Sequence, residues 1–209
     1  MTENTDIYQK QVPILIRNVF VNGKEQEIYL DGTGIIADIA EKIKDHDAEF
    51  IIDGNGATAL PGMINMHTHA AMVLLRGYTD DTPLFPWLST KIWPIEAHMT
   101  PNDIYVGVKL ACLEMIRTGT TTFNDMYFMM DAAADAVEKT GIRACLSYCM
   151  IDKGKHETFE SEAKIMKETV HNLKARNNPR ILAGVAPHAV YTVSEEGLRW
   201  CAEYAKEAY

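Results

Sequence analysis

Two histidines, His67 and His69, flank a threonine at the end of the short apolar run 63–66. Side chains two positions apart on a β-strand point to the same face, so both imidazoles would enter the same space. Neutral imidazole is the commonest protein ligand for zinc and similar metals. A histidine pair of this kind also arises by chance, and its bland alternative is a pair of satisfied core histidines. Its place, after the Pro61-Gly62 turn and at the end of a buried strand, strengthens the case for a metal site, so that from the residues alone the two interpretations stand level.

The segments that must position this pair alternate between strands and helices from residue 60 onward. The clearest helix covers 101–118, because Thr100 is a good N-cap, Pro101 suits the first helical position and Gly119 ends the helix. Apolar patterning predicts strands at 63–66, 120–123, 142–150 and 181–186, and further helices at 130–140, at 160–175 and from residue 194. Four such β/α units specify a parallel sheet with covering helices, either an open doubly wound sheet or part of a (β/α)₈ barrel.

Residues 12–60 have a different pattern, made of short apolar runs separated by turn residues. Runs at 12–21, 27–30, 34–39 and 50–53 are expected strands. Asn22-Gly23 is the pair favoured in two-residue hairpin turns, so the first two strands should be antiparallel neighbours. This part of the chain is a small β layer that does not close on itself.

Several separated segments resemble one known family. They are 60–69, which contains both histidines, then Pro86-Trp87-Leu88, Trp93-Pro94-Ile95-Glu96, 114–123 and Ala186-Pro187-His188. In this order they resemble the amidohydrolase superfamily, in the branch of the 5-methylthioadenosine/S-adenosylhomocysteine deaminases and the triazine hydrolases. The resemblance covers essentially all 209 residues. It implies an α/β fold, the N-terminal half of a metal-dependent (β/α)₈ TIM barrel over 60–209, preceded by the N-terminal part of a small β-sandwich domain over 1–59.

The same resemblance implies a hydrolytic deaminase of adenine nucleosides or their thioethers, with one divalent metal, zinc being the expected ion. His67 and His69 match metal ligands of the family. Glu96 matches the carboxylate that takes the ribose hydroxyls, and His188 matches a histidine that contacts the base. From the residues alone, an exposed acid before a helix cap is the better explanation of Glu96, and a satisfied core histidine that of His188; the family match reverses this preference.

The remaining catalytic parts of the family come from later strands. Its third histidine ligand, working glutamate and metal-binding aspartate are all expected beyond Tyr209, so no catalytic residue is predicted within this chain, which resembles a truncated barrel. Asn124 and Asp125 close the second strand at the same mouth, and the sequence favours neither a functional nor a structural role for them. The methionines at 126, 129 and 130 are typical of packing or of an apolar thioether pocket.

One position departs from the family. Members that accept the amino-acid tail of adenosylhomocysteine carry an arginine near the end of the strand at 142–150, where this chain has Tyr148. A tyrosine cannot hold a carboxylate by charge, and the following loop offers only Lys153 and Lys155. The departure argues against a preference for that charged tail. Another amidohydrolase activity, on a triazine, guanine or cytosine, is the alternative enzyme, and an inactive fragment is the alternative outside enzymes.

The composition limits the classes of partner that the chain is expected to bind. The chain has 20 basic and 29 acidic side chains, a net charge of -9, and no cluster of lysines and arginines, which excludes a nucleic-acid surface and favours a small-molecule partner. No run reaches the roughly 18 to 20 apolar residues of a membrane span, and the polar start does not resemble a signal peptide. The scattered cysteines (Cys112, Cys145, Cys149 and Cys201) predict reduced thiols in a cytoplasmic protein. The sequence leaves open whether the chain forms a homo-oligomer.

Overall fold

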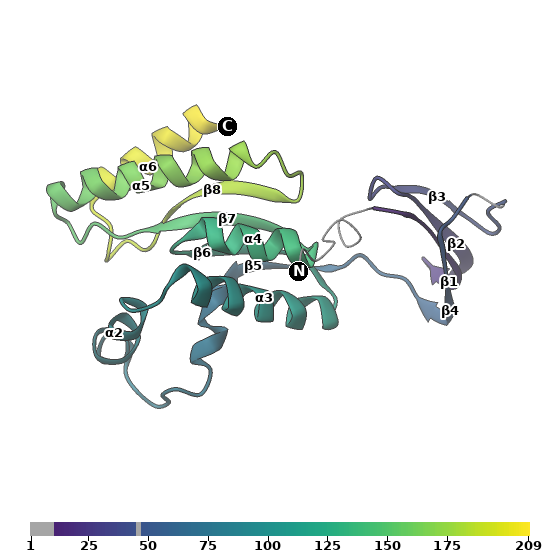
Figure 1. Cartoon of the computed structure of the whole chain (residues 1–209), viewed down its shortest axis with the longest axis horizontal. Coiled ribbons are helices and arrows are strands. Elements are labelled where there is room, and N and C mark those ends of the chain that lie inside the picture. The colour runs from purple at the N-terminus through teal and green to yellow at the C-terminus, as the bar shows by residue number, and fades with distance from the viewer. Residues whose placement is uncertain (1–10, 45–46) are drawn as a thin grey trace, which may run out of the picture. The chain divides into compact units, whose positions relative to one another are not determined.

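The computed structural model describes residues 11–44 and 47–209. The chain divides into two compact units, 1–61 and 62–209, which are coloured from purple to blue and from blue to yellow in Figure 1. Among the helices that the structure describes, none combines the length and the apolar character needed to cross a bilayer.

The first unit is a four-stranded sheet. Its strands are β1 (Pro13–Val21), β2 (Lys24–Asp31), β3 (Ile36–Ala40) and β4 (Phe50–Thr58), in the spatial order β3-β2-β1-β4. β2 runs antiparallel to β1 and β3, and β4 runs parallel to β1. Asn22 and Gly23 join β1 to β2 with φ angles of 51° and 78°, the left-handed values that a tight hairpin turn requires, so the predicted hairpin is confirmed.

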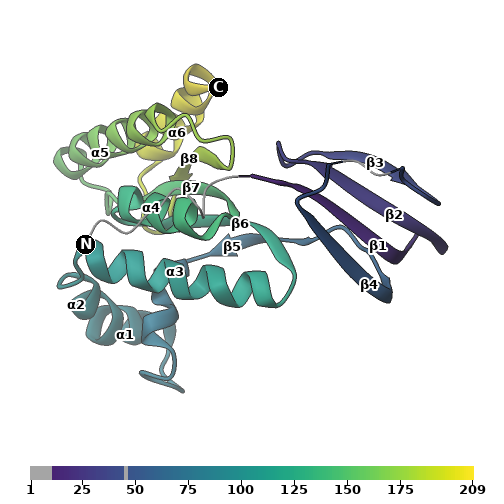
Figure 2. The same ribbon diagram turned by 45° about the vertical axis from the view of Figure 1, so that its right-hand side comes forward.

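The second unit contains a parallel sheet of β5 (Met63–Thr68), β6 (Thr120–Tyr127), β7 (Arg143–Met150) and β8 (Ile181–Pro187). Their spatial order follows the sequence, β5-β6-β7-β8, and every neighbouring pair is parallel. Right-handed crossovers between strands added in one direction place all connecting helices on the same face. This is the winding of a barrel rather than of a doubly wound sheet, and Figure 2 shows the helices gathered on one side of the strands.

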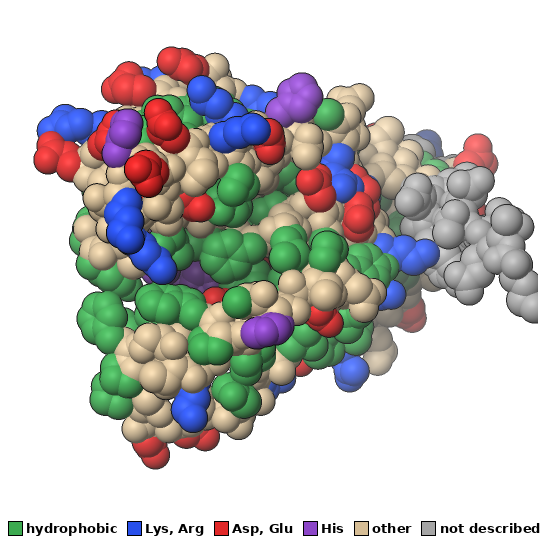
Figure 3. All heavy atoms as spheres, turned by 60° about the vertical axis from the view of Figure 1, so that its left-hand side comes forward, with side chains coloured by type: hydrophobic (Ala, Val, Ile, Leu, Met, Phe, Trp, Pro, Cys, Tyr) green, Lys and Arg blue, Asp and Glu red, His purple; other side chains and the backbone are tan. Residues whose placement is uncertain are grey.

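The covering helices are α3 (Pro101–Arg117), α4 (Met130–Thr140), α5 (His156–Ala175) and α6 (Glu195–Ala208). Thr100 and Asp103 form a capping box at the start of α3, and Ser194 caps α6, so the predicted helix starts are confirmed there. On the face seen in Figure 3, charged side chains are scattered above and below a hollow in which apolar side chains gather.

The start of α5 differs from the sequence prediction. The helix begins at His156, four residues before the predicted start at Glu160. Ile165, although apolar and next to the buried Met166, is 39% exposed, because it lies at the edge of a cavity rather than against the sheet. The inward face is instead formed by Phe159, Ala163, Met166, Val170 and Leu173.

The connection from β5 to α3 is built from short helical turns, η2 (Ala70–Leu75), α1 (Leu84–Trp87), η3 (Leu88–Ile92) and α2 (Trp93–Glu96). η2 packs directly against α3 at Gly107. A Cβ atom at that position would lie 2.7 Å from the Ala71 carbonyl oxygen and 3.0 Å from the Ala71 Cα. Only a glycine lets the two backbones approach so closely.

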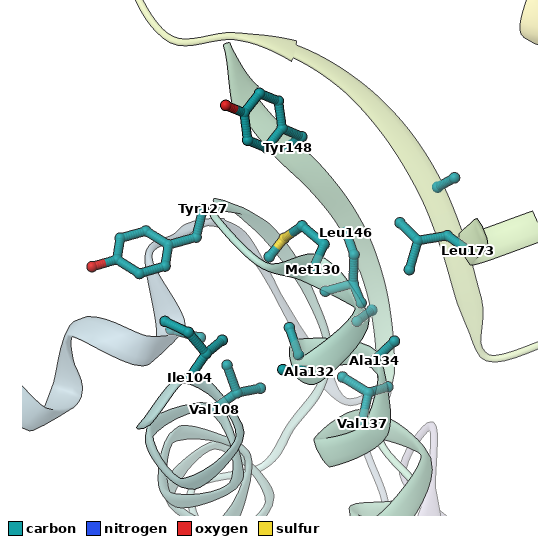
Figure 4. Close-up of a cluster of buried hydrophobic side chains, with 14 of the residues drawn as sticks. Ile104, Val108, Tyr127, Met130, Ala132, Ala134, Val137, Leu146, Tyr148 and Leu173 are labelled. Atoms are coloured by element: carbon teal, nitrogen blue, oxygen red, sulfur yellow. The ribbon is translucent and has the colours of Figure 1, made fainter. Parts of the chain in front are cut away.

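The core of the second unit lies between the sheet and α3, α4 and α5, as Figure 4 shows. α4 contributes mainly short side chains, and Ala133, Ala134 and Ala136 are fully buried. Larger side chains from neighbouring elements fill the remaining space, among them Val108 from α3, Leu146 from β7 and Leu173 from α5. This packed layer holds the carboxyl ends of the strands in place, where the predicted site residues lie.

Candidate active site

A cavity of about 280 Å³ lies at the carboxyl ends of the parallel strands. His67 and His69 reach it from the end of β5, Glu96 from α2 and His188 from the end of β8. All four side chains that the sequence singled out therefore line one space, although they are separated by up to 121 positions along the chain (188 − 67). Their chemical roles stay predictions. Apolar and aromatic side chains complete the wall, including Trp93, Tyr127 and Tyr191.

The two histidines on β5 face each other edge to face, with ring centroids 4.9 Å apart. The His69 Nδ1 atom lies 2.7 Å from the carbonyl oxygen of Met126. Because a carbonyl can only accept, Nδ1 must carry the hydrogen, and the lone pair of the ring is on Nε2. A histidine fixed in this way by a backbone carbonyl is suited to bind a metal through its other nitrogen.

Asp125 on β6 accepts hydrogen bonds from the residues on both sides of His69, Thr68 and Ala70. Its side chain is fully buried, and Oδ1 accepts hydrogen bonds of 2.8 Å from the Thr68 hydroxyl and from the Ala70 amide. Burial raises the pKa of the Asp125 carboxyl, and the hydrogen bonds from Ala70 and Thr68 only partly oppose that effect. Its neighbour Asn124 donates to the Met66 carbonyl over 3.1 Å.

Asn124 and Asp125, for which the sequence favoured neither a functional nor a structural role, thus connect β6 to the histidine-bearing strand β5. The signal for Asp125 was present in the period-two pattern of β6, since Phe123, Asp125 and Tyr127 alternate with less buried residues.

Glu96 is half-buried and hydrogen-bonded. Its Oε1 atom accepts a 2.6 Å hydrogen bond from the hydroxyl of Tyr127, a residue that sequence reasoning did not single out. Burial, together with the neighbouring Glu96 carboxylate, raises the pKa of the Tyr127 phenol, so Tyr127 stays a donor. One carboxylate oxygen is therefore oriented by the protein, and the other oxygen is able to accept hydrogen bonds from a ligand.

His188 follows β8 and is half-buried. Its Nδ1 atom lies 2.7 Å from the hydroxyl oxygen of Thr192, and that hydroxyl donates to the Ala189 carbonyl over 3.2 Å. The Thr192 oxygen therefore accepts from Nδ1–H, which leaves the lone pair on Nε2. Burial lowers the pKa of the His188 imidazole, and the nearby His69 adds to the effect, so neutral imidazole is favoured.

The donor set suits a divalent transition metal but is not complete within the described residues. No group of three or more histidine, cysteine, aspartate or glutamate side chains with metal-binding geometry occurs at 11–44 or 47–209. A catalytic zinc takes three protein ligands and one water. His67 and His69 can supply two nitrogens to such an ion, and His69 has the tautomer that ligation needs.

The four cysteines are all unpaired, as predicted. Cys149 lies in the wall of the cavity, and burial raises the pKa of its thiol to about 12. The cavity wall therefore has no thiolate at neutral pH from this residue, which argues against cysteine as a nucleophile.

A singly wound β/α sheet with imidazoles converging at the carboxyl ends of its strands defines the class of β/α-barrel proteins with a site at that face. The particular family follows from sequence comparison. The chain belongs to the amidohydrolase family, whose profile matches residues 58–208.

Similar proteins agree with this assignment. The chain is 52% identical over 98% of its length to the 5′-deoxyadenosine deaminase of Methanoregula boonei, covering 47% of that protein. It is 46% identical over 93% of its length to the 5′-deoxyadenosine deaminase of Methanocaldococcus jannaschii, covering 46% of that relative. The chain thus spans about half the length of the curated relatives it matches.

Solved structures show the same fold. The adenosine deaminase of Xanthomonas campestris, crystallised with bound zinc, superposes with a TM-score of 0.77 at 28% identity, over 95% of this chain and 47% of that one. The zinc complex of an atrazine chlorohydrolase from Arthrobacter aurescens superposes with a TM-score of 0.77 at 21% identity, over 93% and 51% of the two chains. The α/β fold therefore matches half of these proteins, as the sequence predicted.

Proposed function

We propose that this chain forms part of a metal-dependent hydrolytic deaminase that acts on adenosine analogues altered at the 5′ carbon, such as 5′-deoxyadenosine or 5′-methylthioadenosine. The observation that carries the proposal is the convergence of His67, His69, Glu96 and His188 on one cavity. The names of the similar proteins support the choice of substrate class, because those compared are 5′-deoxyadenosine deaminases. The products would be the corresponding inosine analogue and ammonia.

Each of these residues contacts a different part of the substrate in this proposal. A zinc ion held by His67 and His69 supplies, when bound, a hydroxide near neutral pH. Neutral His188, with its lone pair on Nε2, accepts a hydrogen bond from the purine ring or its exocyclic amine. Glu96 accepts both ribose hydroxyls on the carboxylate oxygen that Tyr127 does not occupy. The ring carbon gains the oxygen of water. One proton of that water leaves with the amino group as ammonia, and the other stays on the neighbouring ring nitrogen of the inosine analogue.

Enzyme assays on the protein expressed from its complete gene test this proposal. We expect zinc to copurify, and ammonia release to be fastest with 5′-deoxy- and 5′-methylthioadenosine among a panel that also contains guanine, cytosine and a chlorotriazine. Faster turnover of any of the last three would assign the protein to the alternative activity. Absence of turnover for the whole panel, in a protein that retains its metal, would refute the proposal.

Glu96 provides a residue-level prediction. Glu96→Gln should reduce kcat/KM for 5′-deoxyadenosine by about ten- to a hundredfold, because a charge-assisted hydrogen bond contributes about 1.5 to 3 kcal/mol. The same change should alter kcat/KM for 9-methyladenine, which has no ribose, by less than about threefold. Steady-state kinetics on the two substrates measure the difference.

Tyr127→Phe is the matched control, since it removes the hydroxyl that orients Glu96 and leaves the charge. It should give a smaller loss on the nucleoside than Glu96→Gln. Equal losses on both substrates for Glu96→Gln would show that Glu96 supports the structure rather than the ribose.

A further inference from the structure

A second, larger cavity of about 720 Å³ adjoins the histidine-lined cavity. The two share a wall that includes Trp93, Glu96 and Tyr127. In the proposed function the base faces the histidines and the ribose faces Glu96. The part of the substrate that remains, the substituent on the 5′ carbon, then extends past Glu96 into the larger cavity. This inference rests on the proposed function for that order of groups.

The floor of the larger cavity is apolar. It is lined by Phe128, by Ile165 and by the methionines Met99, Met129 and Met130. Flexible thioether side chains adapt to apolar and sulfur-containing groups of different lengths. The cavity therefore suits an alkyl or thioether substituent, and its volume exceeds what a single methyl group needs.

The charged side chains in the wall are mostly acidic. Glu96, Asp131, Glu162 and Glu168 line the cavity, and the cation among the lining residues is Lys153. The Lys153 ammonium lies 5.2 Å from the centroid of the Trp93 ring, at the side of the cavity that borders the histidines. Asp131 and Glu168 have cations of their own, since Arg176 lies 3.6 Å from Asp131 and Lys164 lies 3.9 Å from Glu168.

Glu162 differs from Asp131 and Glu168, and resembles Glu96, because no salt bridge to it occurs among the described residues. Its carboxylate accepts the Tyr148 hydroxyl at 3.2 and 3.1 Å and the Ile151 amide at 3.0 Å. Tyr148 is only 8% exposed, and burial together with the Glu162 charge raises the pKa of its phenol, so it remains a donor. The carboxylate is thus fixed in place by Tyr148 and Ile151, and no Lys or Arg of the described residues 11–44 and 47–209 forms a salt bridge with it.

We propose that Glu162 determines specificity at the 5′ position. Held by Tyr148 and Ile151 at the wall of an apolar cavity, its charge favours substituents that end in a neutral group or a cation and disfavours those that end in a carboxylate. A carboxylate brought close to Glu162 is repelled by its like charge, whereas an ammonium group donates a charge-assisted hydrogen bond to it. The cavity therefore selects by the sign of the charge at the tip of the 5′ substituent.

Three thioethers that differ only at the tip test this inference on the complete enzyme: 5′-methylthioadenosine, its 2-aminoethylthio analogue and its carboxymethylthio analogue. We expect kcat/KM and the binding constant for the aminoethyl compound to exceed those for the carboxymethyl compound by at least about a hundredfold. Glu162→Gln should reduce this ratio at least about tenfold, because it removes the charge and keeps an acceptor for Tyr148 and Ile151.

The matched control is Glu160→Gln, which removes the same charge from the same helix at a side chain that is 72% exposed and outside the cavity. It should leave the ratio unchanged. Tyr148→Phe keeps the charge of Glu162 and its hydrogen bond from the Ile151 amide but removes the hydrogen bond from the hydroxyl. It should therefore lower the ratio by less than Glu162→Gln. An aminoethyl-to-carboxymethyl ratio near one in the wild type, or equal ratios in wild type and Glu162→Gln, would overturn the inference.

Calorimetric binding keeps the inference separate from the proposed function. If neither 5′-deoxyadenosine nor any of the three thioethers is deaminated, the proposed function fails, and the binding ratio still decides whether Glu162 selects by charge. If 5′-methylthioadenosine is deaminated and the ratio is near one, the function stands and the specificity proposal fails.

Discussion

β5 and β7 belong to the same parallel sheet and have opposite surroundings. β7 is buried at nearly every position from Ala144 to Met150, whereas every residue of β5 is exposed or half-buried. The predicted metal ligands lie on or directly after β5, the edge strand. Stability in this unit therefore comes mainly from its centre, and the chemistry that we propose depends on its edge.

The edge strand is placed by polar contacts rather than by its own packing. Ile64 is 62% exposed, and the contacts that locate the histidines come from Asn124 and Asp125 on β6. Hydrogen bonds of defined geometry fix orientation more closely than apolar contact does. This arrangement lets the ligand-bearing strand keep a precise position without contributing much to the core.

The largest effect on activity should follow from removing the predicted metal ligands at the edge strand β5. His67→Ala and His69→Ala should each lower activity of the complete enzyme at least about 1,000-fold and release most of the metal, because activation of water depends on the ion. The double variant should be hardly worse than either single one, since the two side chains act as a unit. Metal content, kcat/KM and Tm measured on the same samples check this.

His171→Ala is the control for the loss of an imidazole, because His171 is exposed on α5 and lies outside both cavities. It should keep its metal and its activity. Full metal content in both His67→Ala and His69→Ala would contradict the assignment of these residues as ligands.

For the stability of the fold, a substitution in the central strand β7 should cost more than one in the edge strand β5. Leu146→Ala on β7 should lower the free energy of unfolding by about 2 to 5 kcal/mol, since Leu146 is fully buried and its removal leaves a cavity. Ile64→Ala on β5 should cost less than about 1 kcal/mol in the 209-residue chain, because that side chain is mostly in solvent.

Urea denaturation of both variants in the 209-residue chain measures the difference. A cost for Ile64→Ala as large as that for Leu146→Ala would remove the contrast between edge and centre. A larger cost for Ile64→Ala in the complete protein than in this chain would show that further sequence covers the edge strand.

The sequence predicted the regular elements because local signals specify them. Thr100 and Ser194 cap the starts of α3 and α6, and glycines at 119 and 141 have the left-handed φ angles that end α3 and α4. The stretch 84–96 has no apolar period, so its short helical turns were not foreseen. β6 continues four residues past the predicted end at Phe123, because polar residues there bond to β5 rather than to water.

The site was predictable only through the family resemblance. Spacing singled out His67 and His69, but nothing local distinguished Glu96 or His188 from ordinary surface or core residues. Tyr127 and Glu162 were missed altogether, since their partners Glu96 and Tyr148 lie 31 and 14 positions away. Such pairings depend on which strands become neighbours, and that information is not contained in a local pattern.

A pH-dependent effect should come from Asp152, the second residue after the end of β7. Asp152 is buried and accepts hydrogen bonds from the Ser194 amide and hydroxyl and from the Gly154 amide. Burial alone would raise its pKa, but these hydrogen bonds outweigh burial, and the pKa is lowered from the ordinary value of 3.8. At the centre of the sheet, a polar residue past the strand end therefore serves the structure.

The sign of the pH dependence follows from this lowered pKa. The stabilisation by Asp152 is fully present above pH 3.8 and is lost as the pH falls below that value through the folded-state pKa. Asp152→Asn should therefore be less stable than wild type by about 1 to 3 kcal/mol at pH 7, and the difference should shrink towards pH 3. Urea denaturation at both pH values measures it, and a difference that grows on acidification would contradict the assignment.

The contact between Gly107 and Ala71 has a consequence for engineering. Gly107 comes 38 positions after His69, on a helix, and lines neither cavity, so a mutant library chosen by distance to the substrate would omit it. Yet any side chain there must displace the backbone two residues after His69. Alanine, serine and valine at this position would therefore displace the Ala71 backbone by increasing amounts. Such a series would shift the His69 imidazole in small steps without changing any side chain that lines the two cavities.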